Sequence, residues 1–166
     1  ADLQHSTLVA GALDLNAAVR TLDIAHSQRA GVAGLLTALK DSSAQALFIA
    51  SDAPRGKPGS VQEISYGAGA AAFTLGNENI IAELLGAASR SVQFIDHFRN
   101  AEEQYDYVWE ERWIRDEGYL KQVPETVAAA LKSANVTTSE VSHFILASPL
   151  KGIAAAAAKK IGLTVQ

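Results

Sequence analysis

His26 and Ser27 are neighbouring residues whose types could support covalent catalysis. A serine hydroxyl attacks a carbonyl carbon only when a base within hydrogen-bond reach takes its proton. His26 could be that base, although the side chains of consecutive residues usually point apart. Ser27 also precedes an apolar stretch with helical spacing, where serine commonly caps the first turn. Two interpretations of Ser27 therefore stay open, a nucleophile assisted by His26 and an N-cap.

The residue types and their spacing disfavour cysteine chemistry, dinucleotide binding and metal binding. It has no cysteine, so disulfides, thiolate metal sites and cysteine nucleophiles are excluded within these 166 residues. Gly67-Ala68-Gly69 lacks the third glycine of a dinucleotide-binding loop, because Ala72 stands at that position. Several carboxylates are spread along an expected solvated helix face and predict no metal site: Glu102, Glu103, Glu110, Glu111, Asp116 and Glu117.

The elements that must position these residues begin with a helix over Gln28–Lys40. Its apolar residues run almost all round the helix, which predicts a buried element. Val19–Ile24 alternates apolar and polar residues and predicts a half-covered strand. Ala46–Ala50 is a continuous apolar run, typical of a strand covered on both faces. Together the helix and the buried strand indicate a parallel α/β unit.

The chain then passes through a loop rich in proline and glycine at Ser51–Ser60, which exposes Arg55 and Lys57. A strand over Ala70–Leu75 follows, entered through a glycine turn. Ile80–Gly86 is expected to form another short apolar element.

The second half of the chain changes character. Residues 89–118 hold both tryptophans, Trp109 and Trp113, which should cover a core or an interface edge and could form a subunit contact. An amphipathic helix is predicted from Tyr119 to Ala134 by apolar residues at helical spacing. His143–Ala147 predicts a buried strand, and Ile153–Ile161 predicts a helix that stops at Gly162.

Composition restricts the function classes further. The net charge of −4 gives no broad cationic field, so a nucleic acid is a poor candidate partner. No stretch approaches the ~20 apolar residues that cross a bilayer. The first residues lack a signal pattern, so a cytoplasmic protein is expected. The absence of an initiator methionine suggests a cut-out segment or a processed product of a longer chain.

Four segments, in order, resemble thiolase-fold enzymes over about residues 15 to 165. Leu22–Leu35 resembles the strand and central helix that read Asn-Ala-Cys-Tyr-Gly-Gly-Thr-Ala-Ala-Leu in the family, and Tyr66–Phe73 resembles the family's GDGAAA strand. Trp109–Tyr119 looks like the stretch that introduces the C-terminal half. Phe144–Leu163 resembles the strand that carries a histidine in relatives. The resemblance is greatest to bacterial proteins related to hydroxymethylglutaryl-CoA synthase, followed by β-ketoacyl-ACP synthase III.

This resemblance implies an α/β fold, the thiolase-like layered αβαβα arrangement, of which the chain would cover the middle portion. Residues 1–88 would belong to the second part of the N-terminal thiolase-like half. Residues 89–118 would be a linker or insertion, and residues 119–166 the first part of the C-terminal half.

The two catalytic positions of the family fall on residues without catalytic chemistry. The resemblance places the family's nucleophilic cysteine at Gln28 and its histidine at Ala147. Glutamine cannot attack a thioester, and a methyl group cannot transfer a proton. His143 lies four residues before Ala147, about 13 Å away along a strand, and is no direct substitute.

The resemblance thus implies a protein that acts on or binds acyl-CoA or acyl-carrier thioesters without a covalent cysteine intermediate. If active, it would be an acyltransferase or a carbon–carbon lyase. A catalytically inactive scaffold that docks a partner domain and a transferase that uses Ser27 are the alternatives. Acyl-CoA would be a substrate or ligand, and no cofactor is required. Arg29, Arg55 and Lys57 could meet its phosphates. A homodimer through the Val19–Ile24 strand and an accessory subunit are also expected.

Overall fold

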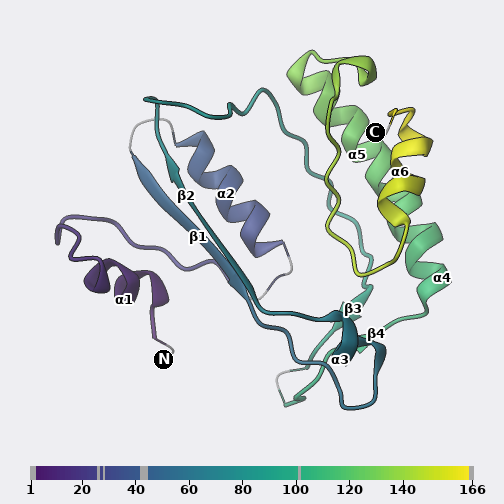
Figure 1. Cartoon of the computed structure of the whole chain (residues 1–166), viewed down its shortest axis with the longest axis horizontal. Helices are drawn as coiled ribbons and strands as arrows, with labels where there is room; N and C mark the ends of the chain where they lie inside the picture. Colours follow the sequence, from purple (N-terminus) through teal and green to yellow (C-terminus); the bar gives the residue numbers. More distant parts are fainter. Residues whose placement is uncertain (1–2, 26, 28, 42–44, 101, 165–166) are drawn as a thin grey trace. The chain divides into compact units, whose positions relative to one another are not determined.

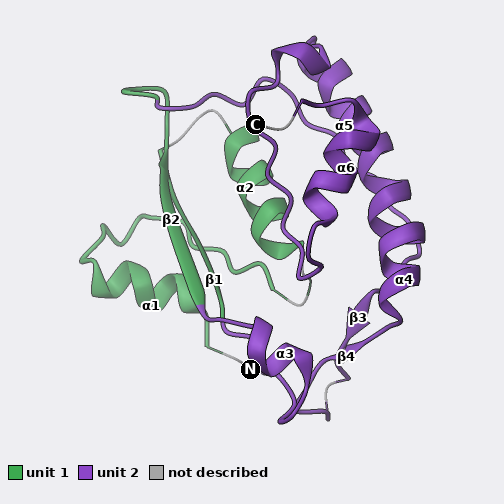
Figure 2. Ribbon diagram, turned by 45° about the vertical axis from the view of Figure 1, so that its right-hand side comes forward, with its two compact units in different colours: residues 1–52, 69–80 green, residues 53–68, 81–166 purple. Residues whose placement is uncertain are grey.

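The computed structural model describes residues 3–25, 27, 29–41, 45–100 and 102–164. They form two compact units, residues 1–52 with 69–80 and residues 53–68 with 81–166 (Figure 2). The first unit contains α1 (His5–Ala12), α2 (Ala30–Lys40), β1 (Ala46–Asp52) and β2 (Gly69–Leu75). The second is mainly helical. No helix among the described residues is long and apolar enough to cross a membrane.

In the first unit, α2 packs on the two-stranded sheet formed by β1 and β2 (Figure 1). The strands pair antiparallel, from Ala46 opposite Leu75 to Asp52 opposite Gly69. Glycines on α2 allow close contact with β1, because a Cβ atom built at Gly34 would lie 3.1 Å from Phe48 Cε2. The helix therefore covers the sheet face that carries Phe48.

The strands at Ala46–Ala50 and Ala70–Leu75 are confirmed, whereas the predicted burial around them is wrong. Gly34 is the only buried residue of α2, and Val32 is 66% exposed. Ile49 on β1 is 43% exposed, so this strand is covered on one face only. The physical reason is that α2 and the two-stranded sheet cover only one face of each other, so the opposite face of each stays exposed. The observed pairing is also antiparallel, whereas a parallel unit was expected.

Residues 19–24 do not form the predicted strand. A strand needs a neighbouring strand to satisfy its backbone groups. The sheets of the described chain are the pair β1–β2 and the pair formed by β3 (His97–Phe98) and β4 (Tyr107–Val108). Val19 N instead donates to Asn16 O in a turn (2.9 Å), and Gln4 Nε2 donates to Thr21 O (3.2 Å). Alternating polarity in this segment therefore reflects contacts with α1.

The second unit has its core where α6 (Ile153–Ile161) packs against α5 (Leu120–Ala134) and the preceding π-helix η1 (Ile114–Tyr119). Both α-helices were predicted, and α6 ends as expected at Gly162, whose φ of +83° favours glycine. The buried apolar residues of the described chain all belong to this region: Ile114, Ile153, Ala157, Ala158 and Leu163.

Residues 86–94 run along η1 and α5 in the opposite direction. Gly86 touches the backbone of Ala134, Arg90 forms an ion pair with Glu125, and the Phe94 ring packs on Gly118. From residue 86 to residue 94, an extended chain covers about 26 Å, and from residue 118 to residue 134, a helix covers about 24 Å. The two lengths match, so the three contacts stay in register. The short apolar element expected at Ile80–Gly86 has no regular secondary structure.

The predicted strand at His143–Ala147 is likewise absent. Ile145 is 93% exposed, and no described strand lies beside this segment to accept its backbone hydrogen bonds. The remaining elements are α3 (Val61–Ser65), β3 (His97–Phe98), β4 (Tyr107–Val108), α4 (Glu111–Trp113) and the 3-10 helix η2 (Thr138–Glu140).

Candidate functional site

The start of α2 is the candidate site because the family resemblance places the nucleophile position there. Ser27 Oγ accepts a hydrogen bond from Arg29 N (3.1 Å), and Ser27 O accepts one from Ala30 N (2.9 Å). The serine hydroxyl therefore satisfies a backbone donor immediately before the helix, as a capping residue does. The N-cap position itself falls on Arg29. His26 and Gln28 lie outside the described residues.

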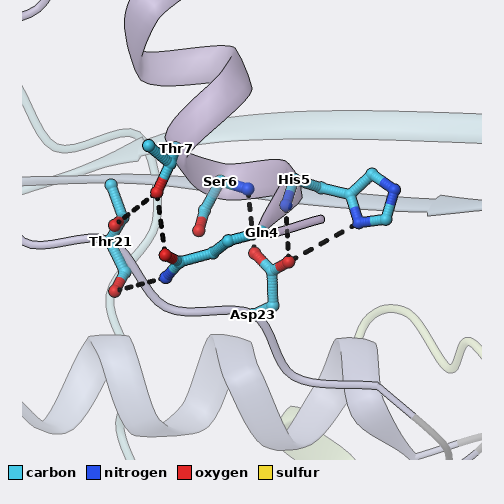
Figure 3. Close-up of polar contacts among 6 residues, drawn as sticks. All are labelled: Gln4, His5, Ser6, Thr7, Thr21 and Asp23. Atoms are coloured by element: carbon cyan, nitrogen blue, oxygen red, sulfur yellow. Dashed lines mark hydrogen bonds and ion pairs between the residues drawn. The ribbon is translucent and has the colours of Figure 1, made fainter. Parts of the chain in front are cut away.

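A polar cluster holds the segment that leads to this site (Figure 3). The Asp23 carboxylate accepts hydrogen bonds from His5 N (2.7 Å) and Ser6 N (2.8 Å), two backbone donors in the first turn of α1. A carboxylate at this end of a helix is also favoured by the helix dipole. We call this cluster the α1 clip; its members are Gln4, His5, Ser6, Thr7, Thr21 and Asp23.

The α1 clip stabilises the charged form of Asp23. The Ser6 side chain beside the carboxylate, the backbone N–H groups of Ser6 and His5, and the His5 imidazole lower the pKa of Asp23 from 3.8 to about 2. Ser6 Oγ is buried and makes no hydrogen bond of regular geometry among the described residues. We therefore assign the shift mainly to the two backbone donors. Local spacing does not indicate this role, because Asp23 occupies a polar position in an alternating pattern.

Arg55 and Lys57 lie in the second unit, on a turn that is fixed against α3. Ser60 Oγ donates to Lys57 O (2.5 Å) and accepts from Glu63 N (3.3 Å), while Gly59 N donates to Glu63 Oε2 (2.7 Å). Both cationic side chains are exposed, and neither pairs with a carboxylate in the described part of the chain. The turn thus presents two uncompensated positive charges.

Gly56 explains how this basic turn stays close to α3. A Cβ atom at Gly56 would lie 2.4 Å from Glu63 N, so any side chain there would collide with the backbone of the helix. We define the basic turn as residues 55–60.

The second expected catalytic position contains no proton-transfer group. Ala147 is exposed, and the neighbouring Ser148 Oγ accepts a hydrogen bond from Leu150 N (3.1 Å). His143 is also exposed on this irregular segment. No group of three or more potential metal ligands occurs among the described residues.

Sequence reasoning missed a second titratable pair, Asp96 and His97, at the start of the β3–β4 hairpin. His97 Nδ1 lies 3.2 Å from Asp96 Oδ1, and His97 N donates to the same oxygen (2.9 Å). The hydrogen bond from Asp96 raises the pKa of His97, against partial burial, which lowers it. Burial raises the pKa of Asp96, but the contacts with His97 outweigh it and the net change is downward. The signal that could have indicated it is an adjacent acid and histidine flanked by Phe94 and Phe98.

No family profile matches the chain. It is similar to hydroxymethylglutaryl-CoA synthase of Picrophilus torridus, with 27% identity over 161 residues that cover 95% of this chain and 46% of the relative. The corresponding protein of Methanosphaera stadtmanae is 24% identical over 96% of this chain and 47% of the relative. That of Methanocaldococcus jannaschii is 32% identical over 60% of this chain and 30% of the relative.

Solved structures agree on the fold. An HMG-CoA synthase complexed with CoA superposes with a TM-score of 0.74 at 20% identity, covering 96% of this chain and 42% of that one. MvaS in complex with 3-hydroxy-3-methylglutaryl coenzyme A gives a TM-score of 0.73 at 18% identity, with the same coverage. The expected thiolase-like α/β fold is therefore confirmed, and the chain spans about half the length of the curated relatives it matches.

Proposed function

Since the chain is homologous to archaeal hydroxymethylglutaryl-CoA synthases and has their thiolase-like fold, we propose that it acts on or binds acyl-CoA or acyl-carrier thioesters. The observation that carries this proposal further is Gln28, which stands where the family resemblance places the nucleophilic cysteine. An amide side chain forms no acyl-enzyme, and this chain has no cysteine to replace it. The proposed reaction therefore proceeds without a covalent cysteine intermediate.

Chemistry without that nucleophile needs two things, donors that stabilise a developing oxyanion and one base. A retro-aldol or Claisen-like step, which breaks or makes a carbon–carbon bond next to the thioester carbonyl, meets this requirement. His26 is our proposed base, and Ser27 would contribute a hydroxyl at the helix start. In this reading the protein is a carbon–carbon lyase or an acyltransferase.

The cationic residues give the proposal its ligand contacts. Coenzyme A carries phosphates, and arginine and lysine bind phosphate by charge-assisted hydrogen bonds. We propose Arg55 and Lys57 on the basic turn, together with Arg29 before α2, as the phosphate-binding residues. Support comes from the exposed, unpaired state of the two cations on a turn that hydrogen bonds hold in place.

Calorimetric titration of acetyl-CoA tests this assignment. Replacing Arg55 and Lys57 together by alanine should weaken binding about tenfold or more, since charge-assisted hydrogen bonds contribute roughly 1.5–3 kcal/mol each. Lys159→Ala, an exposed cation on α6, is the matched control and should leave the affinity unchanged. Equal weakening in both variants, or no binding by the unaltered chain, would contradict the proposal.

An inactive scaffold that docks a partner domain is the second candidate, because Gln28 and Ala147 both lack the expected catalytic groups. Acetyl-CoA binding without release of free CoA or aldehyde from a panel of acyl-CoAs would favour the scaffold. Radiolabel from acetyl-CoA that stays on the protein, and is lost in Ser27→Ala, would favour a transferase that uses Ser27.

The proposal extends to organisation. We propose a cytoplasmic homodimer whose contact includes residues 19–24, with the division at residues 88 and 118 separating the two thiolase-like halves from a linker. Leu22 is 70% exposed in that segment, which leaves an apolar side chain available for such a contact.

A further inference from the structure

Five aromatic rings of the second unit form one continuous series. Phe98 lies 5.3 Å from Tyr107, Tyr107 lies 5.9 Å from Trp109, Trp109 lies 6.1 Å from Trp113, and Trp113 stacks on Phe94 at 4.3 Å between ring centroids. We call these five residues the aromatic strip. They come from β3, β4, α4 and the segments that flank them, so the hairpin and the helical region together build it.

Most of the aromatic strip faces solvent. Tyr107 is 56% exposed, Trp109 49%, Phe98 41% and Trp113 37%. Phe94 anchors the strip, because its ring fills the space where a Cβ atom of Gly118 would lie at 2.7 Å. Contiguous exposed aromatic surface on a protein commonly marks an interaction site, and tryptophan and tyrosine are the residues that most often dominate binding energy there.

The charge around the strip is strongly negative. Residues 94–118 contain eight carboxylates and three arginines, a net charge of −5, whereas the whole chain carries −4 and the remainder therefore +1. Some of these carboxylates are neutralised, since Asp106 lies 3.8 Å from Arg99 and Asp116 lies 2.8 Å from Arg115. Glu102, Glu103 and Glu111 are exposed and form no ion pair within the described residues.

The unpaired carboxylates border the rings along the chain. Glu102 and Glu103 lie in the loop between β3 and β4, which the Phe98–Tyr107 ring pair closes. Glu111 begins α4, between Trp109 and Trp113. An incoming group therefore meets aromatic faces and negative charge on the same stretch of surface.

We propose that the aromatic strip and its bordering carboxylates form a docking surface for an arginine-bearing segment of a partner protein. Guanidinium matches both features, because its planar face stacks on aromatic rings while its N–H groups bind carboxylates. The net charge of −5 attracts such a segment from solution and repels acidic ones. This inference does not depend on which reaction, if any, the chain catalyses.

Tryptophan fluorescence offers a direct test, because both tryptophans of the chain belong to the strip. The probes are peptides of about twelve residues that alternate alanine with arginine, lysine or glutamate and contain no aromatic residue. We expect the arginine peptide to change the tryptophan emission on binding and to bind several-fold more tightly than the lysine peptide. The glutamate peptide should cause no change.

Variants separate the contributions of charge and rings. Glu102→Lys with Glu103→Lys should weaken binding of the arginine peptide about tenfold, and Trp109→Leu should do the same through loss of the ring. Glu83→Lys, an exposed carboxylate outside the strip, is the control and should change the affinity less than about twofold. Circular dichroism checks the folding of each variant, and Tyr107→Leu replaces Trp109→Leu if the latter unfolds.

Several results would overturn the proposal. They are an unchanged emission at saturating arginine peptide, equal affinities for the arginine and lysine peptides, or equal weakening by Glu83→Lys. Concentration-dependent dimerisation that Trp109→Leu abolishes would instead assign the strip to a second copy of this chain.

Discussion

The Asp23 side chain holds the segment before the candidate site at the start of α2 against α1. Its carboxylate replaces the missing partners of two backbone donors on α1, and the next described residues lead directly to Ser27 and α2. Asp23 thereby links its own segment to the start of α1, since it lies 18 residues after His5 and 17 residues after Ser6. Distant hydrogen-bond partners of this kind leave no signature in local spacing.

Replacing Asp23 by asparagine should loosen the α1 clip. The amide retains one acceptor oxygen but loses the charge that the helix start favours, so backbone amides of His5 and Ser6 should exchange with solvent several-fold faster. Hydrogen exchange followed by NMR measures this change. Asp14→Asn is the control, since Asp14 has a φ of 52° that asparagine adopts readily. Equal exchange in the unaltered chain and in Asp23→Asn would contradict the capping role.

The same carboxylate predicts an acid dependence. The pKa of Asp23 is lowered in the folded chain to about 2 from 3.8, so its stabilising contribution is complete above the ordinary value and is lost as the pH falls through about 2. The His5 and Ser6 amides should therefore lose their protection from hydrogen exchange, corrected for intrinsic rates, as the pH falls from 3.8 to about 2. In Asp23→Asn the corrected rates should not vary with pH there.

At the scale of elements, apolar spacing predicted the main helices, whereas two of the expected strands do not form. Apolar spacing located α5, and Gly162 marked the end of α6, because helical hydrogen bonds are made within the segment itself. Residues 19–24 and 143–147 have strand-like patterns without forming strands, because a strand depends on a neighbour that the pattern does not report. At the candidate site, the sequence located the start of α2 near Ser27 but did not reveal the α1 clip or the contact of Gly56 with α3.

The passage of residues 86–94 along α5 depends on two glycines, which predicts a stability effect. A Cβ atom at Gly86 would lie 2.5 Å from Ala134 N, and one at Gly118 would lie 2.7 Å from the Phe94 ring. Alanine at either position should destabilise the fold by about 1–3 kcal/mol, the usual cost of overpacking. Urea unfolding measures it, and Gly67→Ala, with no heavy atom within 4 Å, should change stability much less. Equal stability of all three variants would argue against this packing.

At the scale of the whole chain, the distribution of polar and apolar surface separates two kinds of interaction. Acidic charge is concentrated at the aromatic strip, whereas residues 19–24, which include the exposed Leu22, carry no net charge because Arg20 offsets Asp23. Apolar surface without net charge suits a contact between identical copies, since apolar burial needs no opposite charge. This contrast favours residues 19–24 over the strip as the proposed homodimer contact.

Leu22→Lys therefore tests the dimer. Burying a leucine side chain contributes roughly 1.5–3 kcal/mol, and an ammonium group at the contact adds a desolvation cost, so the variant should dissociate at concentrations where the unaltered chain is dimeric. Analytical ultracentrifugation measures the dissociation constants. Ile64→Lys is the matched control, because Ile64 on α3 is 89% exposed and lies outside the proposed contact. A dimer that survives Leu22→Lys, or is lost equally in Ile64→Lys, would place the contact elsewhere, and a monomeric unaltered chain would remove it.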